Sequence, residues 1–204
     1  MIIACLDLEG VLIPEIWVNF AHKTGIEELK LTTRDIPDYD VLMKKRLAIL
    51  DERQYALKDI EEVISQLNPL EGAKDFLNQL REEFQVIILS DTFYQFAMPL
   101  MKQLGYPTLF CHNLEINDQG KITNYCLRMQ DQKREAVKRL KELNFKVVAA
   151  GDSYNDTTML SEAHEGILFC PPQNVIEEFP QFPVTKNYSE LLATFREASK
   201  KIKN

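Results

Sequence analysis

Short apolar runs alternate along the chain with longer segments of helical periodicity. The runs at 2–7, 86–89, 146–150 and 166–169 have the length and composition of buried strands. Apolar positions three and four residues apart predict helices between and after them, at about 73–80, 94–104, 133–143, 155–164 and 191–202. This alternation predicts an α/β fold with a doubly wound, mostly parallel sheet.

Two segments interrupt the alternation. Residues 15–67 hold only helical patterns, with an apparent helix start at 37–40, and the breaker-rich stretch 68–72 follows them. Two β-compatible runs within 106–128 flank the turn-forming residues 117–120. The sequence therefore predicts a helical insertion after the first strand and a β-hairpin near 106–128.

Composition limits the class of protein. The chain has 204 residues, 45% of them hydrophobic and 27% charged, as in soluble proteins with one main domain. A net charge of −7, with no basic stripe beyond 200–203, argues against a nucleic-acid partner. No apolar run approaches the roughly 20 residues that span a bilayer, and the first apolar run reaches Asp7 too soon for a secretory signal. We therefore expect a cytoplasmic protein with no membrane partner.

The cysteines show no metal-binding or disulfide pattern. Cys5, Cys111, Cys126 and Cys170 are scattered along the chain without a CxxC pair. Because Cys is among the residue types most often buried, we expect buried free thiols.

Polar side chains follow three of the predicted strands. Asp7 and Glu9 follow the first, Ser90 follows the run 86–89, and 151–156 follows the run 146–150. Because ligands gather at the carboxyl ends of the strands in an open parallel sheet, we expect these groups to converge. Carboxylates suit Mg²⁺, whereas Ser90, Lys133 and the amides of a helix beginning just after Ser90 can hold phosphate oxygens. The sequence therefore predicts a magnesium-dependent phosphoryl-transfer site.

The same residues form four ordered motifs. The segments 7–11 (Asp-Leu-Glu-Gly-Val), 89–92 (Leu-Ser-Asp-Thr), Lys133 and 151–156 (Gly-Asp-Ser-Tyr-Asn-Asp) resemble those of the haloacid dehalogenase (HAD) superfamily in order and spacing. Glu9 stands where most phosphatases of the superfamily have a second Asp. In this respect, and in its Ser-Asp-Thr-Phe and Gly-Asp-Ser-Tyr-Asn-Asp forms, the chain is similar to the ThrH group of the phosphoserine phosphatase branch.

The resemblance implies a domain organisation and a set of metal ligands. It implies a HAD-like catalytic core at 1–14 and 70–204 and a helical cap at 15–69, like the small cap of phosphoserine phosphatases. The implied ligands of the cofactor Mg²⁺ are oxygen atoms of Asp7, Glu9 (through its backbone carbonyl), Asp152 and Asp156.

Catalytic roles follow from the same resemblance. It implies that Asp7 attacks phosphorus to form an aspartyl-phosphate, and that Glu9 protonates the leaving oxygen and then deprotonates the attacking water or alcohol. Ser90 and Lys133 would neutralise the phosphoryl oxygens.

The resemblance also implies the substrate. Arg46 would pair with a carboxylate and Glu15 with an ammonium group, and an amino-acid phosphate ester supplies both. The implied substrate-binding residues are Glu15, Arg46, Ser90, Asp91, Thr92, Lys133 and Asn155. We thus expect a phosphoserine phosphatase of serine biosynthesis that forms a homodimer. Phosphoryl transfer from phosphoserine to homoserine, a step of threonine biosynthesis, is the implied second activity.

Other interpretations remain open. The site could serve another small phosphate ester, and a phospho-receiver signalling domain also uses a strand-end Asp, Mg²⁺ and a Lys, although it needs neither a cap nor Glu9. Taken singly, Arg46 could be a solvated helix charge, Glu15 a helix N-terminal acid and Asp7 a strand-end cap. Three histidines show no metal-ligand spacing and are interpreted as structural or surface residues: His22, His112 and His164.

Overall fold

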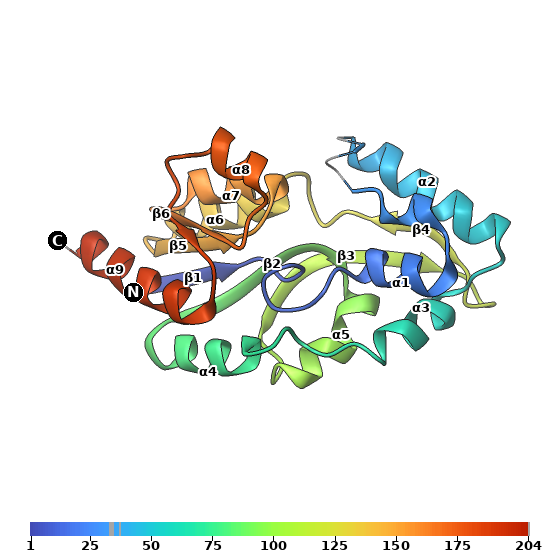
Figure 1. The fold of residues 1–204 in the computed structure, drawn as a ribbon, viewed down its shortest axis with the longest axis horizontal. Coiled ribbons are helices and arrows are strands. Elements are labelled where there is room, and N and C mark those ends of the chain that lie inside the picture. Colours follow the sequence, from blue (N-terminus) through green and yellow to red (C-terminus); the bar gives the residue numbers. More distant parts are fainter. Residues whose placement is uncertain (33–34, 37, 204) are drawn as a thin grey trace.

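The computed structural model describes residues 1–32, 35–36 and 38–203 and contains one sheet with helices on both faces (Figure 1). The strands are β1 (Ile2–Leu6), β2 (Gln85–Phe93), β3 (Thr108–Ile116), β4 (Ile122–Cys126), β5 (Lys146–Gly151), β6 (Glu165–Phe169) and β7 (Val184–Thr185). The α-helices are α1 (Ile16–Thr24), α2 (Tyr39–Glu52), α3 (Leu57–Ile64), α4 (Ala73–Glu83), α5 (Tyr94–Gln103), α6 (Gln132–Glu142), α7 (Thr157–Glu162), α8 (Gln173–Glu178) and α9 (Tyr188–Lys203). Two short 3-10 helices are η1 (Glu27–Lys30) and η2 (Tyr154–Asp156).

The strand order confirms the predicted fold class. Strands lie in the order β4-β3-β2-β1-β5-β6-β7, and each described neighbouring pair is parallel except β3 and β4. The antiparallel pair is the predicted hairpin, and its turn is closed by the backbone bond from Asn117 N to Lys121 O at 3.0 Å. The sheet is therefore doubly wound and mostly parallel, with one antiparallel strand at an edge.

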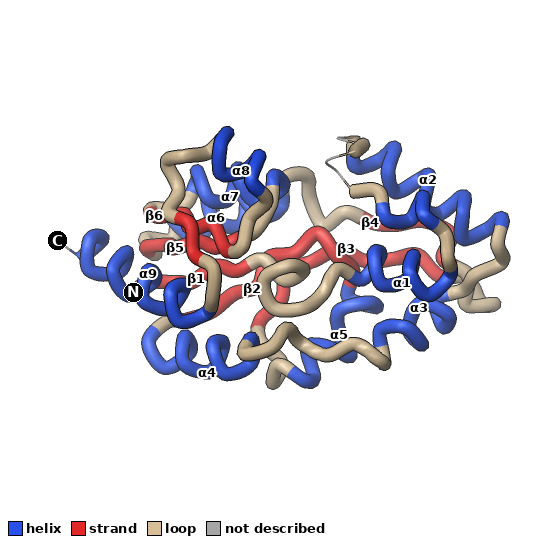
Figure 2. Tube along the Cα trace, in the orientation of Figure 1, coloured by secondary structure: helices blue, strands red, loops and turns tan. Residues whose placement is uncertain are grey.

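Alternate residues of the central strands enter two separate cores. In β1, Ala4 and Leu6 pack with apolar residues of α4, α5 and α9, whereas Ile3 and Cys5 pack with those of α6, α7 and α8. Figure 2 shows the strands as a continuous layer between these two helical layers. Burial on both faces explains why the strand sequences are continuous apolar runs rather than alternating ones.

The inserted helices cover the β3–β4 end of the sheet. Helices α1, α2 and α3 lie at that end in Figure 1, and their buried apolar side chains join the same core as those of α5. The amide of Leu57 donates to Gly120 O in the hairpin turn at 3.0 Å, and Lys121 reaches Asp51 at 3.3 Å. The insertion is thus tied to the hairpin by polar contacts as well as by packing.

The start of α2 matches the predicted start at 37–40, of which Pro37 lies outside the described residues. The helix begins at Tyr39, and the Asp38 side chain accepts hydrogen bonds from the amides of Asp40 and Val41. Asp38 is therefore a conventional N-cap.

Strand β2 is longer than the sequence predicted. The helix predicted at about 94–104 is confirmed as α5, which begins at Tyr94, but the strand continues to Phe93 rather than ending near Leu89. Thr92 and Phe93 favour extended backbone, and pairing with β3 resumes at Phe93 and His112 after an irregularity. The N-terminus of α5 therefore lies at Tyr94 rather than directly after Ser90, and a contribution of its amides to phosphate binding stays a prediction.

The thiol prediction was half right. Cys5 and Cys111 are buried, whereas Cys126 and Cys170 are exposed. Cys126 ends the edge strand β4, and Cys170 follows β6 in a left-handed conformation (φ 45°), so neither lies between packed layers. As for membranes, none of the helices in the described ranges combines the length and apolar character needed to cross a bilayer.

Candidate active site

Three neighbouring strands bring the strand-end residues to one edge of the sheet. Leu6 pairs with Ile88 of β2 on one side and with Ala150 of β5 on the other. The Asp7 amide continues the ladder with a 2.9 Å bond to Ala150 O. Because the strands are parallel and in register, the side chains that follow them meet at the same edge, as the sequence analysis expected.

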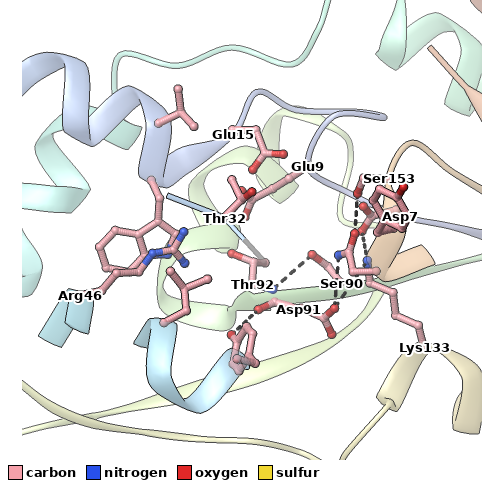
Figure 3. Close-up of a pocket in the computed structure, with 16 residues that line it drawn as sticks. Asp7, Glu9, Glu15, Thr32, Arg46, Ser90, Asp91, Thr92, Lys133 and Ser153 are labelled. Carbon is pink, nitrogen blue, oxygen red and sulfur yellow. Dashed lines mark hydrogen bonds and ion pairs between the residues drawn. The ribbon is translucent and has the colours of Figure 1, made fainter. Parts of the chain in front are cut away.

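Lys133 lies at the centre of this edge. Its side chain is 2% exposed, and its Nζ lies 2.8 Å from both Asp7 Oδ1 and Asp156 Oδ1 and 3.7 Å from Asp91 Oδ2 (Figure 3). Burial disfavours the charged ammonium, but the carboxylates of Asp156, Asp7 and Asp91 outweigh it and hold the pKa of Lys133 well above its usual value. The site therefore contains a permanent buried cation.

Three carboxylates form a cluster that could hold a metal ion. Oxygen atoms of Asp7, Asp152 and Asp156 lie within 4.8 Å of one another. Asp156 is oriented by two backbone donors, since its Oδ2 accepts from the amides of Asp152 at 2.9 Å and Ser153 at 3.1 Å. Burial and the nearby negative charges of Asp156 and Asp152 raise the pKa of Asp7 well above its usual value, although Lys133 opposes them. Oxygen donors that repel one another in this way fit a hard divalent cation such as Mg²⁺.

Two glycines make room for this cluster. A Cβ on Gly10, whose φ is +77°, would lie 2.6 Å from Asp152 Oδ2, and a Cβ on Gly151 would lie 2.3 Å from Asp156 Cγ. Glycine at both positions lets backbone approach the carboxylates closely.

The predicted acid and base, Glu9, faces Glu15. Its Oε2 accepts a 3.1 Å bond from the amide of Ile16, the first residue of α1. Burial, the charge of Glu9 and a hydrogen bond between the two carboxyl groups raise the pKa of Glu15 to about 8. The two side chains point toward one another in Figure 3, and both line the same pocket.

Arg46 is buried on the other side of the same pocket. It is 8% exposed, its guanidinium stacks 4.7 Å from the Trp17 ring centroid, and its Nη2 donates to Leu31 O at 2.8 Å. Its Nε has no hydrogen-bond partner among the described residues. The interpretation of Arg46 as a solvated helix charge was therefore wrong, and the orphaned donor is available to an anionic ligand.

The remaining predicted substrate residues line the same pocket of about 250 Å³. The Thr92 amide donates to Ser90 Oγ at 3.3 Å, and Asn155 Nδ2 lies 3.4 Å from Asp91 Oδ2. The pocket is lined by Asp7, Glu9, Glu15, Trp17, Val18, Thr32, Tyr39, Leu42, Arg46, Ser90, Asp91, Thr92, Lys133, Ser153, Tyr154 and Asn155. The structure thus brings the predicted catalytic and substrate residues into one cavity, and Asp152 and Asp156 cluster with Asp7, one of the residues that line it.

Three further side chains at the site were not predicted. The Tyr39 hydroxyl donates to Asp91 O at 3.0 Å, Gln132 Nε2 lies 3.3 Å from Asp91 Oδ1, and His112 Nε2 lies 3.5 Å from the same oxygen. Gln132 directly precedes Lys133 on α6, which was a usable signal. No motif identified Tyr39 or His112, because only the folded chain brings α2 and β3 to Asp91.

Comparisons with known proteins agree with this geometry. The family model described as haloacid dehalogenase-like hydrolase matches residues 3–164. The chain is 65% identical to "Phosphoserine phosphatase ThrH" of Pseudomonas aeruginosa, over 98% of this chain and 97% of that protein. It is 62% identical to a phosphoserine phosphatase of Pseudomonas syringae pv. tomato, over 97% of this chain and 83% of that protein.

Solved structures share the fold. A phosphoserine phosphatase in a phospho-aspartyl intermediate analogue form has a TM-score of 0.75 at 22% identity, with 94% of this chain and 97% of that chain covered. A substrate-bound phosphoserine phosphatase has a TM-score of 0.75 at 21% identity, with 95% and 97% covered. The phospho-receiver alternative is excluded by these matches, and the chain belongs to the haloacid dehalogenase-like hydrolases, within the phosphoserine phosphatase branch and similar to its ThrH group.

Proposed function

We propose that this protein is a Mg²⁺-dependent phosphoserine phosphatase that acts through an aspartyl-phosphate on Asp7. One observation carries the proposal: a single small pocket has a nucleophile and phosphate-binding groups at one end, and at the other a buried guanidinium whose Nε has no hydrogen-bond partner among the described residues. Figure 3 shows Lys133, Ser90 and Asp7 on one side and Arg46 on the other, with Glu15 above them. The names of the relatives support the same substrate, since two of them with more than 60% identity are phosphoserine phosphatases.

The substrate fits this layout by charge. Phosphoserine carries a phosphate, a carboxylate and an ammonium group. The phosphate pairs with Lys133 and Ser90, the carboxylate with the free Nε side of Arg46, and the ammonium with Glu15. Leu42 and Trp17 give the pocket apolar walls, and walls of this kind strengthen each ionic contact by excluding water.

The chemistry proceeds in two displacements on phosphorus. An Asp7 oxygen attacks phosphorus, the bond from phosphorus to the serine oxygen breaks, and Glu9 gives that oxygen its proton. Glu9 then removes a proton from water, which attacks the phosphorus of the aspartyl-phosphate and regenerates the Asp7 carboxylate. Ser90 and Lys133 stabilise the charge on the phosphoryl oxygens in both steps.

The cofactor fits the carboxylate cluster. Asp7, Asp152 and Asp156 would hold Mg²⁺ together with the backbone carbonyl of Glu9. Burial and the negative charges of Asp156 and Asp152 raise the pKa of Asp7, and a bound cation would favour its ionised form. When bound, Mg²⁺ neutralises charge on the transferring phosphoryl group.

Transfer to homoserine is the second activity in this proposal. The hydroxyl of homoserine would take the place of the attacking water beside Glu9, and its carboxylate and ammonium would use the same Arg46 and Glu15 contacts. The helical cap at 15–69, which contributes both of these residues, would enclose the substrate over the core at 1–14 and 70–204. The cytoplasmic location, the homodimer and the biosynthetic pathways stay predictions.

The test compares phosphate release from three esters in the presence of Mg²⁺. L-phosphoserine has both recognition groups, O-phosphoethanolamine lacks the carboxylate, and 3-phosphoglycerate has a hydroxyl in place of the ammonium. We expect L-phosphoserine to have the highest kcat/KM by at least about tenfold, because each missing group leaves a charged partner unpaired. Equal turnover of the three would refute the Arg46 and Glu15 assignments and favour a phosphatase for another small ester.

The acceptor is tested in the same assay with added L-homoserine. Phosphohomoserine that appears at the expense of free phosphate would support transfer, and L-2-aminobutyrate, which lacks the hydroxyl, is the matched control. Unchanged phosphate release with no phosphohomoserine would refute it.

A further inference from the structure

The Asp91 carboxylate is a junction of several segments beside Lys133. Its Oδ2 lies 3.7 Å from Lys133 Nζ and 3.4 Å from Asn155 Nδ2, and its Oδ1 lies 3.3 Å from Gln132 Nε2 and 3.5 Å from His112 Nε2. These donors come from α6, η2 and β3, so Asp91 is held by elements far apart in sequence. Among the described residues, the carboxylates that could share a metal ion are those of Asp7, Asp152 and Asp156, and Asp91 is not one of them.

His112 can only donate toward Asp91. Its side chain is 3% exposed, and its Nδ1 accepts the backbone N–H of Arg128 at 3.0 Å. A ring nitrogen that accepts carries no proton, so in the neutral imidazole the proton is on Nε2, which faces Asp91. The rings of Phe93 and Tyr39 pack at centroid distances of 6.4 Å and 6.3 Å and fix the imidazole orientation.

The position of Asp91 bears on Lys133. Burial opposes ionisation of Asp91, but Lys133, His112 and Gln132 more than offset it and hold its pKa below the usual range. An ionised Asp91 attracts the Lys133 ammonium from 3.7 Å, in competition with Asp7, which lies 2.8 Å from it. Without that attraction the ammonium would be drawn fully onto the carboxylate cluster and away from the phosphoryl oxygens.

We propose that His112 is a positioning residue, whose Nε2–H holds the Asp91 carboxylate so that Lys133 stays directed toward the phosphoryl group. This inference rests on the proposed function, because it concerns the same phosphoryl transfer. From the sequence, His112 was interpreted as a structural or surface residue, and this inference gives it a role in the reaction.

Two substitutions separate this role from a structural one. His112→Gln can place an amide N–H near the original Nε2 and keep the contact with Asp91, but it loses the acceptor for the Arg128 amide. His112→Asn keeps an acceptor near Nδ1 and loses the donor to Asp91. If His112 positions Asp91, His112→Asn should lower kcat about tenfold with KM changed less than about twofold, and His112→Gln should stay within about threefold of wild type.

A double-mutant cycle tests whether the effect passes through Asp91. In an Asp91→Ala background, His112→Asn should cause no further loss of kcat, because the contact is already gone. His164 is the control for loss of a hydrogen bond from the backbone to an imidazole. Its Nδ1 accepts from the Val147 amide at 3.1 Å, and it does not line the pocket. His164→Phe should leave kcat unchanged.

The outcomes are distinct. Equal losses in His112→Asn and His112→Gln, a loss only in His112→Gln, or additive losses in the double variant would overturn the inference while the proposed function stands. If wild type turns over no phosphate ester, the proposed function fails and the kinetic role of His112 falls with it. Long-range ¹H–¹⁵N NMR spectra then still test the contact: they should show a neutral Nε2–H tautomer whose signal shifts in Asp91→Ala, and an Nδ1–H tautomer would refute it.

Discussion

Replacing Lys133 with Met should destabilise the metal-free protein strongly at neutral pH and weakly at pH 5. Met fills similar volume but leaves the buried Asp7 and Asp156 carboxylates, each 2.8 Å from Nζ, without their cation. Removing one partner of a buried ion pair typically costs about 3–5 kcal/mol.

Protonation sets an upper limit to this cost. The variant can relieve the repulsion by protonating one carboxyl group. For a carboxyl with an unfolded-state pKa of about 3.9, protonation costs about 4 kcal/mol at pH 7 and about 1.5 kcal/mol at pH 5. The folded-state pKa of Asp7 is already raised and would rise further, so the folded state binds more protons than the unfolded state. Stability of the variant therefore falls as pH rises from about 5 to 7.

The assay is urea unfolding followed by circular dichroism, in EDTA, at both pH values. We expect a loss of about 3–4 kcal/mol at pH 7 and about 1–2 kcal/mol at pH 5, and added Mg²⁺ should recover part of the loss at pH 7. Lys30→Met is the control, because Lys30 pairs with the exposed Glu27 at the same 2.8 Å distance and its removal should change nothing measurable. A loss that is equal at the two pH values, or smaller than that of the control, would refute the reasoning.

Three further predictions concern metal and substrate binding. Gly10→Ala should raise the Mg²⁺ concentration for half-maximal activity about tenfold, since its Cβ meets Asp152 Oδ2 at 2.6 Å; Gly25→Ala, with a similar positive φ but open space, should leave it unchanged. Because the pKa of Glu15 is about 8, its ionised fraction rises about tenfold from pH 7 to 9. KM for L-phosphoserine should fall over the same pH range, whereas KM of the Glu15→Gln variant should show no such fall. Arg46→Lys should raise KM for L-phosphoserine about tenfold and leave that for O-phosphoethanolamine nearly unchanged, and a rise for both would contradict carboxylate binding.

The linear pattern of residues determined the fold class and the catalytic edge of the sheet. Short continuous apolar runs that alternate with helical segments are typical of strands buried on both faces of a parallel sheet, and such strands place the residues that follow them at one edge. Asp7, Ser90 and Asp152 were therefore predictable as neighbours. Lys133 was also predictable, because it opens the helix that precedes β5 and matches the third motif.

Only the tertiary structure decided which other side chains meet at that edge. Arg46 shares the buried face of α2 with Leu42 and Leu50, but its stacking against the Trp17 ring depends on how α1 and α2 pack. His112 lies inside an apolar strand and reaches Asp91 only because β3 pairs beside β2. Periodicity reports which face of an element is buried, but it contains no information on which element covers that face. Contacts between distant segments are set by the packing of the whole chain, and the role of His112 emerges only there.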